Sequence, residues 1–120
     1  MDLILLVAPT TPLERMKKIS TNTRGFTYLV SVTGVTGERS KMENRVENLI
    51  IKLKDISPTP IAVGFGISSP EHVNKVRGWG ADGVIVGSAF VKRISNSTLT
   101  DVVNEVGNFC NQMRVAADGN

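Results

Sequence analysis

The stretch Ile61-Ala62-Val63-Gly64-Phe65-Gly66-Ile67-Ser68 decides the predicted fold of this chain, together with Gly83-Val84-Ile85-Val86-Gly87-Ser88-Ala89. Each is a short, β-branched apolar run that ends in glycine and serine, and each is followed by a helical pattern. At such a tip the chain turns through a residue without a Cβ atom, and the first free N–H groups of the next helix point toward an anion. One tip could equally serve close packing. Two consecutive tips are typical of the phosphate site formed by the last two loops of a (β/α)8 barrel.

Four apolar segments are predicted as strands, with amphipathic helices between them: Leu3–Val7, Thr27–Val32, Ile61–Val63 and Gly83–Val86. They are continuous apolar runs, the pattern of parallel strands that are covered on both faces. The alternation of strands and helices indicates right-handed βα crossovers in one parallel sheet. Either a doubly wound open sheet or part of a barrel fits this alternation.

The residues favour the barrel over a dinucleotide-binding open sheet. Gly64 and Gly66 supply two glycines of the dinucleotide fingerprint, but Ser69 stands at the third position. No acidic ribose-binding residue stands out about twenty residues later, and there is no Walker A lysine loop. Four βα units are half of a barrel, because a whole one takes about 250 residues and this chain has 120. We treat residues 1–120 as a single partial-barrel domain.

A half-barrel would expose two strand edges and an apolar inner face, which favours pairing with another body. The chain is therefore expected to dimerise, to dock on another half-barrel, or to be a fragment of a longer protein. A stable, well-behaved monomer would count against this expectation.

The helical segments carry start signals and apolar stripes. Thr11-Pro12-Leu13-Glu14 is interpreted as a capping box, and Ser69-Pro70 as the cap of a helix that runs to about Trp79. Two stripes are predicted to face the core: Val46, Leu49, Ile50 and Leu53, and in the last helix Leu99, Val102, Val103, Val106, Phe109, Cys110 and Met113. Cys110 is thus interpreted as a buried apolar side chain and not as a reactive thiol.

Composition narrows the class of protein. Hydrophobic residues make up 41% and charged residues 21% of the chain, as in ordinary globular domains. The net charge of +3 comes from scattered basic residues, and aromatic residues reach only 5%, so a nucleic-acid surface is not expected. The longest apolar run is too short to cross a membrane, and it lacks the flanks of a signal peptide. A cytoplasmic or plastid-stroma location with no targeting segment in this chain is expected, and the single cysteine suits such a reducing compartment.

Four motifs together resemble the alpha subunit of tryptophan synthase. Their residues are most similar to those of the plant type, which includes the related indole-3-glycerol phosphate lyases. They are the residues 6–12 LVAPTTP, 28–37 YLVSVTGVTG, 63–68 VGFGIS and 78–89 GWGADGVIVGSA. Their order and spacing cover nearly the whole chain. The resemblance implies an α/β fold, namely the C-terminal half, (βα)4, of a TIM (β/α)8 barrel with parallel strands, corresponding to the fifth to eighth strands of the family.

The resemblance also implies a function and its residues. The family cleaves indole-3-glycerol phosphate to indole and glyceraldehyde 3-phosphate without a cofactor or a metal, and passes indole to a beta subunit. Gly37, Gly66, Gly87 and Ser88 match its phosphate-binding positions. Tyr28 and Phe65 match residues beside the substrate, and Thr36 matches a loop threonine that orients a catalytic carboxylate.

The acid and base groups that the resemblance implies for the family have no match in this chain. The resemblance implies a glutamate and an aspartate for acid–base chemistry from earlier strands, so the chain alone is expected to be inactive. Among local groups, Glu38 is interpreted as a solvated loop charge, and Asp82 is expected at the barrel's lower face. His72 is expected to face solvent, and Trp79 to pack a helix on the barrel. No titratable residues show the spacing of a metal site or a hydrolase triad.

Three functions stay open at this point. The first is the phosphate-binding half of an indole-3-glycerol phosphate lyase, the second is an inactive protein that binds a phosphate ligand or the beta subunit, and the third is a half-barrel for another phosphorylated substrate. The third is disfavoured by Tyr28, Phe65 and the loop that contains Thr36.

Overall fold

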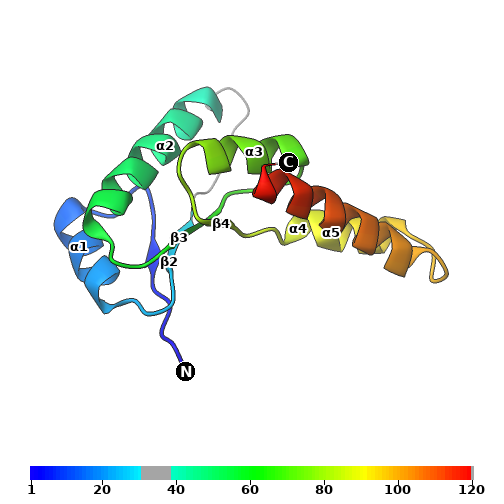
Figure 1. The fold of residues 1–120 in the computed structure, drawn as a ribbon, viewed down its shortest axis with the longest axis horizontal. Coiled ribbons are helices and arrows are strands. Elements are labelled where there is room, and N and C mark those ends of the chain that lie inside the picture. The colour runs from blue at the N-terminus through cyan, green and yellow to red at the C-terminus, as the bar shows by residue number, and fades with distance from the viewer. Residues whose placement is uncertain (31–38, 120) are drawn as a thin grey trace.

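The computed structural model describes residues 1–30 and 39–119. Strands and helices alternate along the chain, and a pair of helices ends it (Figure 1). In order, the elements are β1 (Leu6–Val7), α1 (Leu13–Asn22), β2 (Thr27–Val30), α2 (Arg39–Ile56), β3 (Ile61–Gly64), α3 (Pro70–Gly78), β4 (Gly83–Val84), α4 (Ser88–Asn96) and α5 (Val102–Asp118). All four predicted strands are present; β1 and β4 are shorter than predicted, and β3 extends one residue further, to Gly64.

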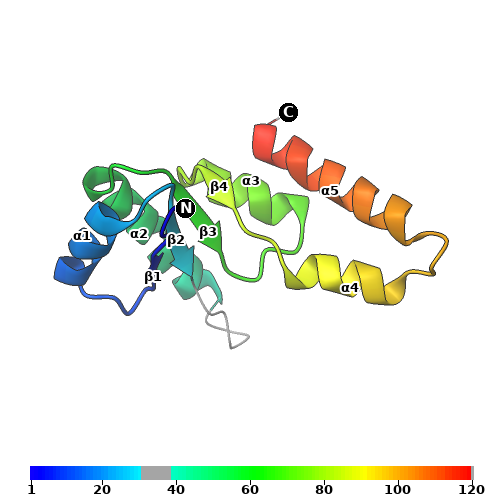
Figure 2. The same cartoon turned by 90° about the horizontal axis from the view of Figure 1, so that it is seen from below.

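The strands form one parallel sheet in the order β1-β2-β3-β4. Sequential order without reversal is the arrangement of consecutive barrel strands, whereas a doubly wound sheet reverses its order at a switch point. Helices α1, α2 and α3 lie in an arc on one side of the strands, and α4 and α5 extend from it as a helical hairpin (Figures 1 and 2). The observed sheet is therefore a curved segment of the barrel type.

The register separates two faces of this sheet. Leu6, Tyr28, Ala62 and Gly83 lie side by side in one row, and the next row is formed by Val7, Leu29, Val63 and Val84. The second row packs under the helices: Val7, Leu29 and Val63 are fully buried. The first row faces away from the helices, where 58% of Leu6 is exposed. This inner face is the apolar surface that the sequence predicts for a half-barrel.

Two helical predictions are confirmed in detail. Val46, Leu49, Ile50 and Leu53 of α2 are all buried, as a core-facing stripe requires. The N-cap of α3 is Ser69, whose hydroxyl accepts the backbone N–H of His72 at 3.3 Å, and Pro70 stands at the first helical position. Helix α3 ends at Gly78 with Trp79 as its C-cap.

The capping box predicted at Thr11 is wrong. Helix α1 begins at Leu13, Pro12 stands at the N-cap position, and no side chain caps the helix. The Thr11 hydroxyl instead accepts the N–H of Ala8 at 2.9 Å, and the Thr11 N–H donates to the Ala8 carbonyl. Thr11 therefore closes the turn after β1, which takes its hydroxyl away from the helix.

The stripe predicted for the last helix needs correction. Phe109 and Met113 are buried as expected, but Leu99 precedes the helix and is 98% exposed, and Val103 is 78% exposed. Cys110 is also exposed, so its interpretation as a buried side chain is wrong. The reason is helix phase: the buried line runs through Phe109, Met113 and Ala116, and Cys110 lies 100° round the helix from Phe109.

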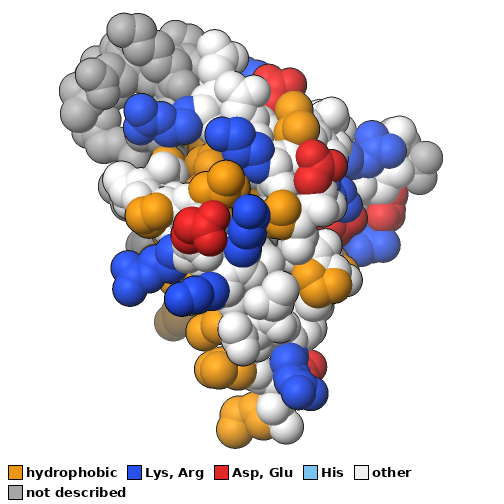
Figure 3. Space-filling model, turned by 90° about the vertical axis from the view of Figure 1, so that its left-hand side faces the viewer, with side chains coloured by type: hydrophobic (Ala, Val, Ile, Leu, Met, Phe, Trp, Pro, Cys, Tyr) orange, Lys and Arg blue, Asp and Glu red, His pale blue; other side chains and the backbone are white. Residues whose placement is uncertain are grey.

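Within the part of the chain that the structure describes, no helix combines the length and apolar character that crossing a membrane requires. Lysine and arginine side chains on the side of α1 and α2 stand among apolar and acidic ones and form no continuous basic surface there (Figure 3).

Candidate functional site

The carboxyl ends of the parallel strands meet at one edge of the sheet, and five predicted site residues lie on the strands that end there or just beyond them. Tyr28 lies on β2, Phe65 and Gly66 follow β3, and Gly87 caps α4 beyond β4. Ser88 is the first residue of α4. Thr36 and Gly37 lie outside the described residues. The fold thus gathers the two glycine tips on the side that the sequence predicts.

Gly66 occupies a position that requires glycine. Its φ is +58°, a left-handed conformation that side chains with a Cβ atom rarely adopt. The following loop is anchored on both sides, because Ile67 is buried and the Ser68 N–H donates to His72 Nδ1 at 3.3 Å. His72 is half-buried and holds this loop, so it does more than face solvent as we expected. The tip is therefore shaped by the backbone and by the first turn of α3.

The second tip presents free donors. The first hydrogen bonds of α4 run from the N–H groups of Phe90 and Val91 to the Gly87 carbonyl. The N–H groups of Ser88 and Ala89 precede these bonds, and such groups at a helix start have no intrahelical acceptor. Together with the positive end of the helix dipole they suit an anion. A Cβ atom on Gly87 would meet nothing within 4 Å, so the space beside this turn is open.

Tyr28 and Gly64 depend on each other. A Cβ atom placed on Gly64 would lie 2.7 Å from the Tyr28 hydroxyl oxygen and 3.4 Å from the Ile85 Cβ. The glycine thus lets the tyrosine ring cross β3 on the inner face of the sheet. Sequence reasoning treats Gly64 only as part of a strand tip, and it misses this contact because the two residues belong to different strands.

Phe65 lies on the other face. It is 6% exposed, and its ring stacks on Trp79 with the centroids 6.2 Å apart. Side chains alternate along a strand, so Phe65 shares the helix-facing side with Val63 while Tyr28 faces inward. The packing role predicted for Trp79 is confirmed. A ligand role for Phe65 stays a prediction, and in this structure its ring contacts another side chain.

The carboxylate of Asp82 belongs to the opposite edge of the sheet, as the sequence predicts. It accepts hydrogen bonds from Lys54 Nζ at 2.8 Å and from the Ile61 N–H at 2.9 Å. Partial burial acts to raise the pKa of Asp82, but the hydrogen bonds from Lys54 and Ile61 and the Lys54 charge outweigh it and lower the pKa below 3.8. Asp82 is therefore an ionised structural group.

Among the described residues near the glycine tips, an acid with a shifted pKa lies at the start of α3. Hydrogen bonds from its own backbone N–H and from the Ser69 hydroxyl lower the pKa of Glu71. This is the behaviour of a carboxylate in the first turn of a helix. Within the described residues no three His, Cys, Asp or Glu side chains are grouped so that they could hold a metal ion.

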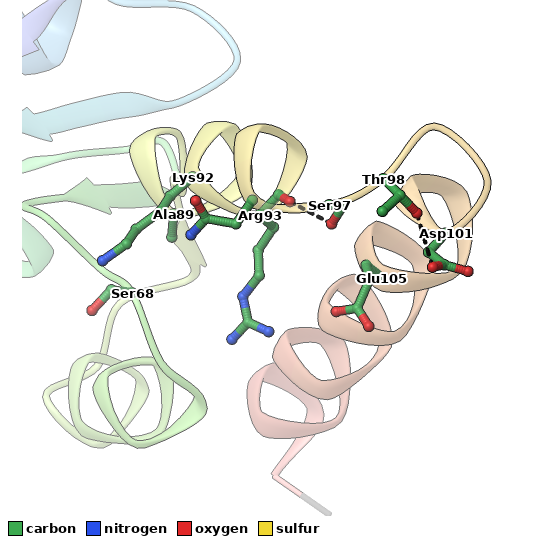
Figure 4. A pocket seen from close by; sticks show the side chains of 9 residues that line it. Ser68, Ala89, Lys92, Arg93, Ser97, Thr98, Asp101 and Glu105 are labelled. Atoms are coloured by element: carbon green, nitrogen blue, oxygen red, sulfur yellow. Dashed lines mark hydrogen bonds between the residues drawn. The ribbon is translucent and has the colours of Figure 1, made fainter.

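A cleft that sequence reasoning misses lies beside the tips, between α4 and α5 (Figure 4). Its volume is about 710 Å³, and it is lined by Ser68, Ala89, Lys92, Arg93, Asn96, Ser97, Thr98, Asp101 and Glu105. Among the described residues, the predicted phosphate-binding residues Gly66, Gly87 and Ser88 do not line it. The adjacent pair Lys92-Arg93 is visible in the sequence, but the two acids that face it come from the next helix.

The family model for the tryptophan synthase alpha chain matches residues 1–118. The chain belongs to this family. A tryptophan synthase alpha chain from Prochlorococcus marinus subsp. pastoris is 80% identical over 117 residues, which is 98% of this chain and 42% of the relative. One from a Synechococcus is 64% identical and is matched over 44% of its length.

Solved structures of this family show the same fold. A tryptophan synthase structure from M. tuberculosis superposes with a TM-score of 0.79 at 27% identity, over 98% of this chain and 41% of the other. A tryptophan synthase alpha subunit from Pyrococcus furiosus gives 0.78 at 38% identity, over 95% and 45%. A further Pyrococcus furiosus structure, of an α2β2 complex, gives 0.76 at 38% identity, over 100% and 46%. This chain is thus a partial TIM barrel that spans less than half the length of these relatives.

Proposed function

We propose that this chain is the phosphate-binding half of a tryptophan synthase alpha barrel that cleaves indole-3-glycerol phosphate to indole and glyceraldehyde 3-phosphate. The observation that carries the proposal is the pair of tips at one sheet edge, where Gly66 has a left-handed backbone and α4 opens with free N–H groups at Ser88 and Ala89. Membership of the alpha chain family supplies the reaction class.

In this proposal the phosphate binds to backbone donors. The N–H groups of the first turn of α4 and the Ser88 hydroxyl donate to the phosphate oxygens, and the helix dipole favours the dianion. The Gly66 backbone and, outside the described residues, Gly37 complete the phosphate-binding groups, and Thr36 orients a catalytic carboxylate of the complete barrel. Tyr28 lines the inner face of the sheet on the same side as the substrate. The whole of residues 1–120 acts as one partial-barrel domain.

The proton transfers belong to groups outside this chain. The reaction needs a base for the indole N–H or a glycerol hydroxyl and an acid for the ring carbon. Asp82 is bound at the far edge and Glu71 is held in the first turn of α3, so neither is placed for this work. We propose that the acid and base come from the other half of a complete barrel, and that the isolated chain binds the phosphate ester without cleaving it.

Two protein partners follow from the proposal. The first is a body that completes the barrel: the open sheet edges of this chain would pair with four further strands, either from another half-barrel or from a second copy of this chain. A beta subunit is the second partner, because a solved relative is an α2β2 complex. The two similar alpha chains described above come from cyanobacteria, and cyanobacteria have no plastids, which favours the cytoplasm of the two expected compartments.

The phosphate site is tested by placing a charge in it. Gly87→Asp puts a carboxylate where a Cβ atom has open space and where the ligand carries its negative charge. We expect indole-3-glycerol phosphate binding, measured by isothermal titration calorimetry on the 120-residue chain, to weaken at least about a hundredfold because two like charges then meet at one site. Indole-3-glycerol, which lacks the phosphate, is expected to bind weakly to both proteins.

Two control variants separate charge from shape. Gly87→Ala adds the Cβ atom alone and is expected to keep most of the affinity. Gly107→Asp adds the same charge on α5, at a glycine whose Cβ would also meet nothing within 4 Å, and it should leave binding unchanged. Equal affinity of Gly87→Asp and Gly107→Asp for indole-3-glycerol phosphate would contradict the site.

A further inference from the structure

The cleft between α4 and α5 has two oppositely charged walls. Helix α4 supplies Lys92 and Arg93. On the other side, Asp101 is the residue before α5, and Glu105 lies in the first turn of α5. The lining therefore carries two positive and two negative side chains and no net charge. In the described part of the chain, no ion pair within 4.0 Å joins either cation of this cleft to an acid. Arg93 and Glu105 face a common space without forming an ion pair with each other (Figure 4).

The cation at the centre of the cleft is held in place. The Arg93 guanidinium carbon lies 4.5 Å from the centroid of the Phe109 ring, and that ring is itself 1% exposed and packs edge-on against Phe90. A guanidinium stacked on a buried aromatic face keeps its N–H edge free for bidentate bonds to a planar anion. Arg93 therefore presents a fixed fork, which suits a carboxylate.

The opposite wall presents an acceptor for a cation. Figure 4 shows that Arg93 and Glu105 point into the space between α4 and α5 from opposite sides, and that Lys92 extends toward Ser68. The Asp101 carboxylate already accepts the Thr98 hydroxyl at 2.9 Å, so Glu105 is the less engaged acid. Ser68 and Asn96, which also line the cleft, offer hydroxyl and amide groups, and the volume of about 710 Å³ lies within the range of small-molecule sites.

We propose that this cleft binds a free α-amino acid with a polar side chain, as a second ligand site beside the proposed phosphate site. The carboxylate of the ligand binds the Arg93 fork, and its ammonium group binds Glu105. A cleft with separated charges and no net charge complements a zwitterion, whereas a simple anion would meet Glu105 and Asp101 and a simple cation would meet Lys92 and Arg93. Because these side chains are largely exposed and screened by salt, the affinity belongs in the millimolar range.

An NMR titration of the isotope-labelled 120-residue chain with L-glutamine tests the site. We expect saturable shifts of the backbone amides around Lys92, Arg93 and Glu105. N-acetyl-L-glutamine lacks the ammonium group and L-glutaminamide lacks the carboxylate, so each should bind about tenfold more weakly, the effect of one lost charged hydrogen bond. Inorganic phosphate should not compete with L-glutamine at these amides.

Matched variants assign the two walls. Glu105→Gln should weaken L-glutamine about tenfold and abolish the preference over N-acetyl-L-glutamine, and Arg93→Gln should abolish the preference over L-glutaminamide. Arg24→Gln makes the same charge change at an exposed residue of another loop and should alter neither. The proposal is overturned if L-glutamine causes no saturable shifts at these amides, or if N-acetyl-L-glutamine binds as tightly as L-glutamine.

Discussion

At the scale of single residues, the contact between Gly64 and Tyr28 is the sharpest constraint on the predicted site. Gly64 adopts no unusual backbone conformation, so its lack of a side chain serves the tyrosine and not the turn. A Cβ atom there would lie 2.7 Å from the Tyr28 hydroxyl oxygen, which is closer than real Cβ contacts. The half-buried tyrosine can swing away, so the main effect of a larger residue falls on the position of its hydroxyl group.

We predict that Gly64→Ala lowers the free energy of unfolding by about 1 kcal/mol or less and weakens indole-3-glycerol phosphate binding, because Tyr28 must leave its place on the inner face. The double variant Gly64→Ala with Tyr28→Phe removes the clashing oxygen and should regain the lost stability. Urea unfolding and calorimetric titration of the single and double variants measure both effects. Strictly additive stability changes would show that the two residues do not interact.

At the scale of the elements, Asp82 connects three segments at the lower edge of the sheet. Its carboxylate binds Lys54 of α2 and the first N–H of β3, and it stands directly before β4. Sequence reasoning places Asp82 at this edge but does not reveal the ion pair, because Lys54 lies on a helix whose rotation about its axis depends on the core.

The lowered pKa of Asp82 makes the stabilisation by its bonds to Lys54 and Ile61 depend on pH. The carboxylate is more acidic in the folded protein than its ordinary value of 3.8, so its stabilisation is complete above that pH and is lost as the pH falls through the folded-state pKa. We predict that Asp82→Asn costs about 0.5–1 kcal/mol at neutral pH and that the difference shrinks in acid below pH 3.8. Urea unfolding at a series of pH values measures this. The control variant is Asp55→Asn, at an exposed acid next to Lys54 on α2. Its stability difference from the unchanged protein should not shrink in acid in this way. Identical pH curves for the two variants would refute the stabilising role of Asp82.

At the scale of the whole molecule, the uncovered sheet face is the dominant feature. Helices α1, α2 and α3 cover one side of the strands (Figure 1), while Leu6 on the other side remains 58% exposed. In the described residues β1 pairs only with β2, and β4 pairs only with β3. Two four-stranded sheets joined edge to edge reach the eight parallel strands that close a barrel.

We predict that the isolated chain associates through this face and that Leu6→Lys weakens the association about tenfold or more, because a buried leucine is worth about 1.5–3 kcal/mol. Sedimentation velocity over a range of concentrations measures the dissociation constant. Leu13→Lys is the matched control, since Leu13 is 49% exposed but lies on α1. Equal weakening by both substitutions would place the contact elsewhere.

The local sequence by itself determined the order of the elements, the α2 stripe, the Ser69 cap and the two glycine tips. These features depend on residues within one or two turns of each other: a cap needs a hydroxyl next to free N–H groups, and a stripe needs apolar side chains at helical spacing. The four-stranded parallel sheet followed from them, and so did the position of Gly66, Gly87 and Ser88 near one edge.

Only the tertiary structure decided which side of each element is covered. Cys110 and Phe109 are adjacent apolar residues, and α5 buries Phe109 because α4 places Phe90 and Arg93 against that ring. Phe65 likewise contacts Trp79, across a helix and a loop. The cleft between α4 and α5 arises from the angle of that hairpin. Each of these outcomes depends on surfaces that are distant in sequence, so no local pattern contains it.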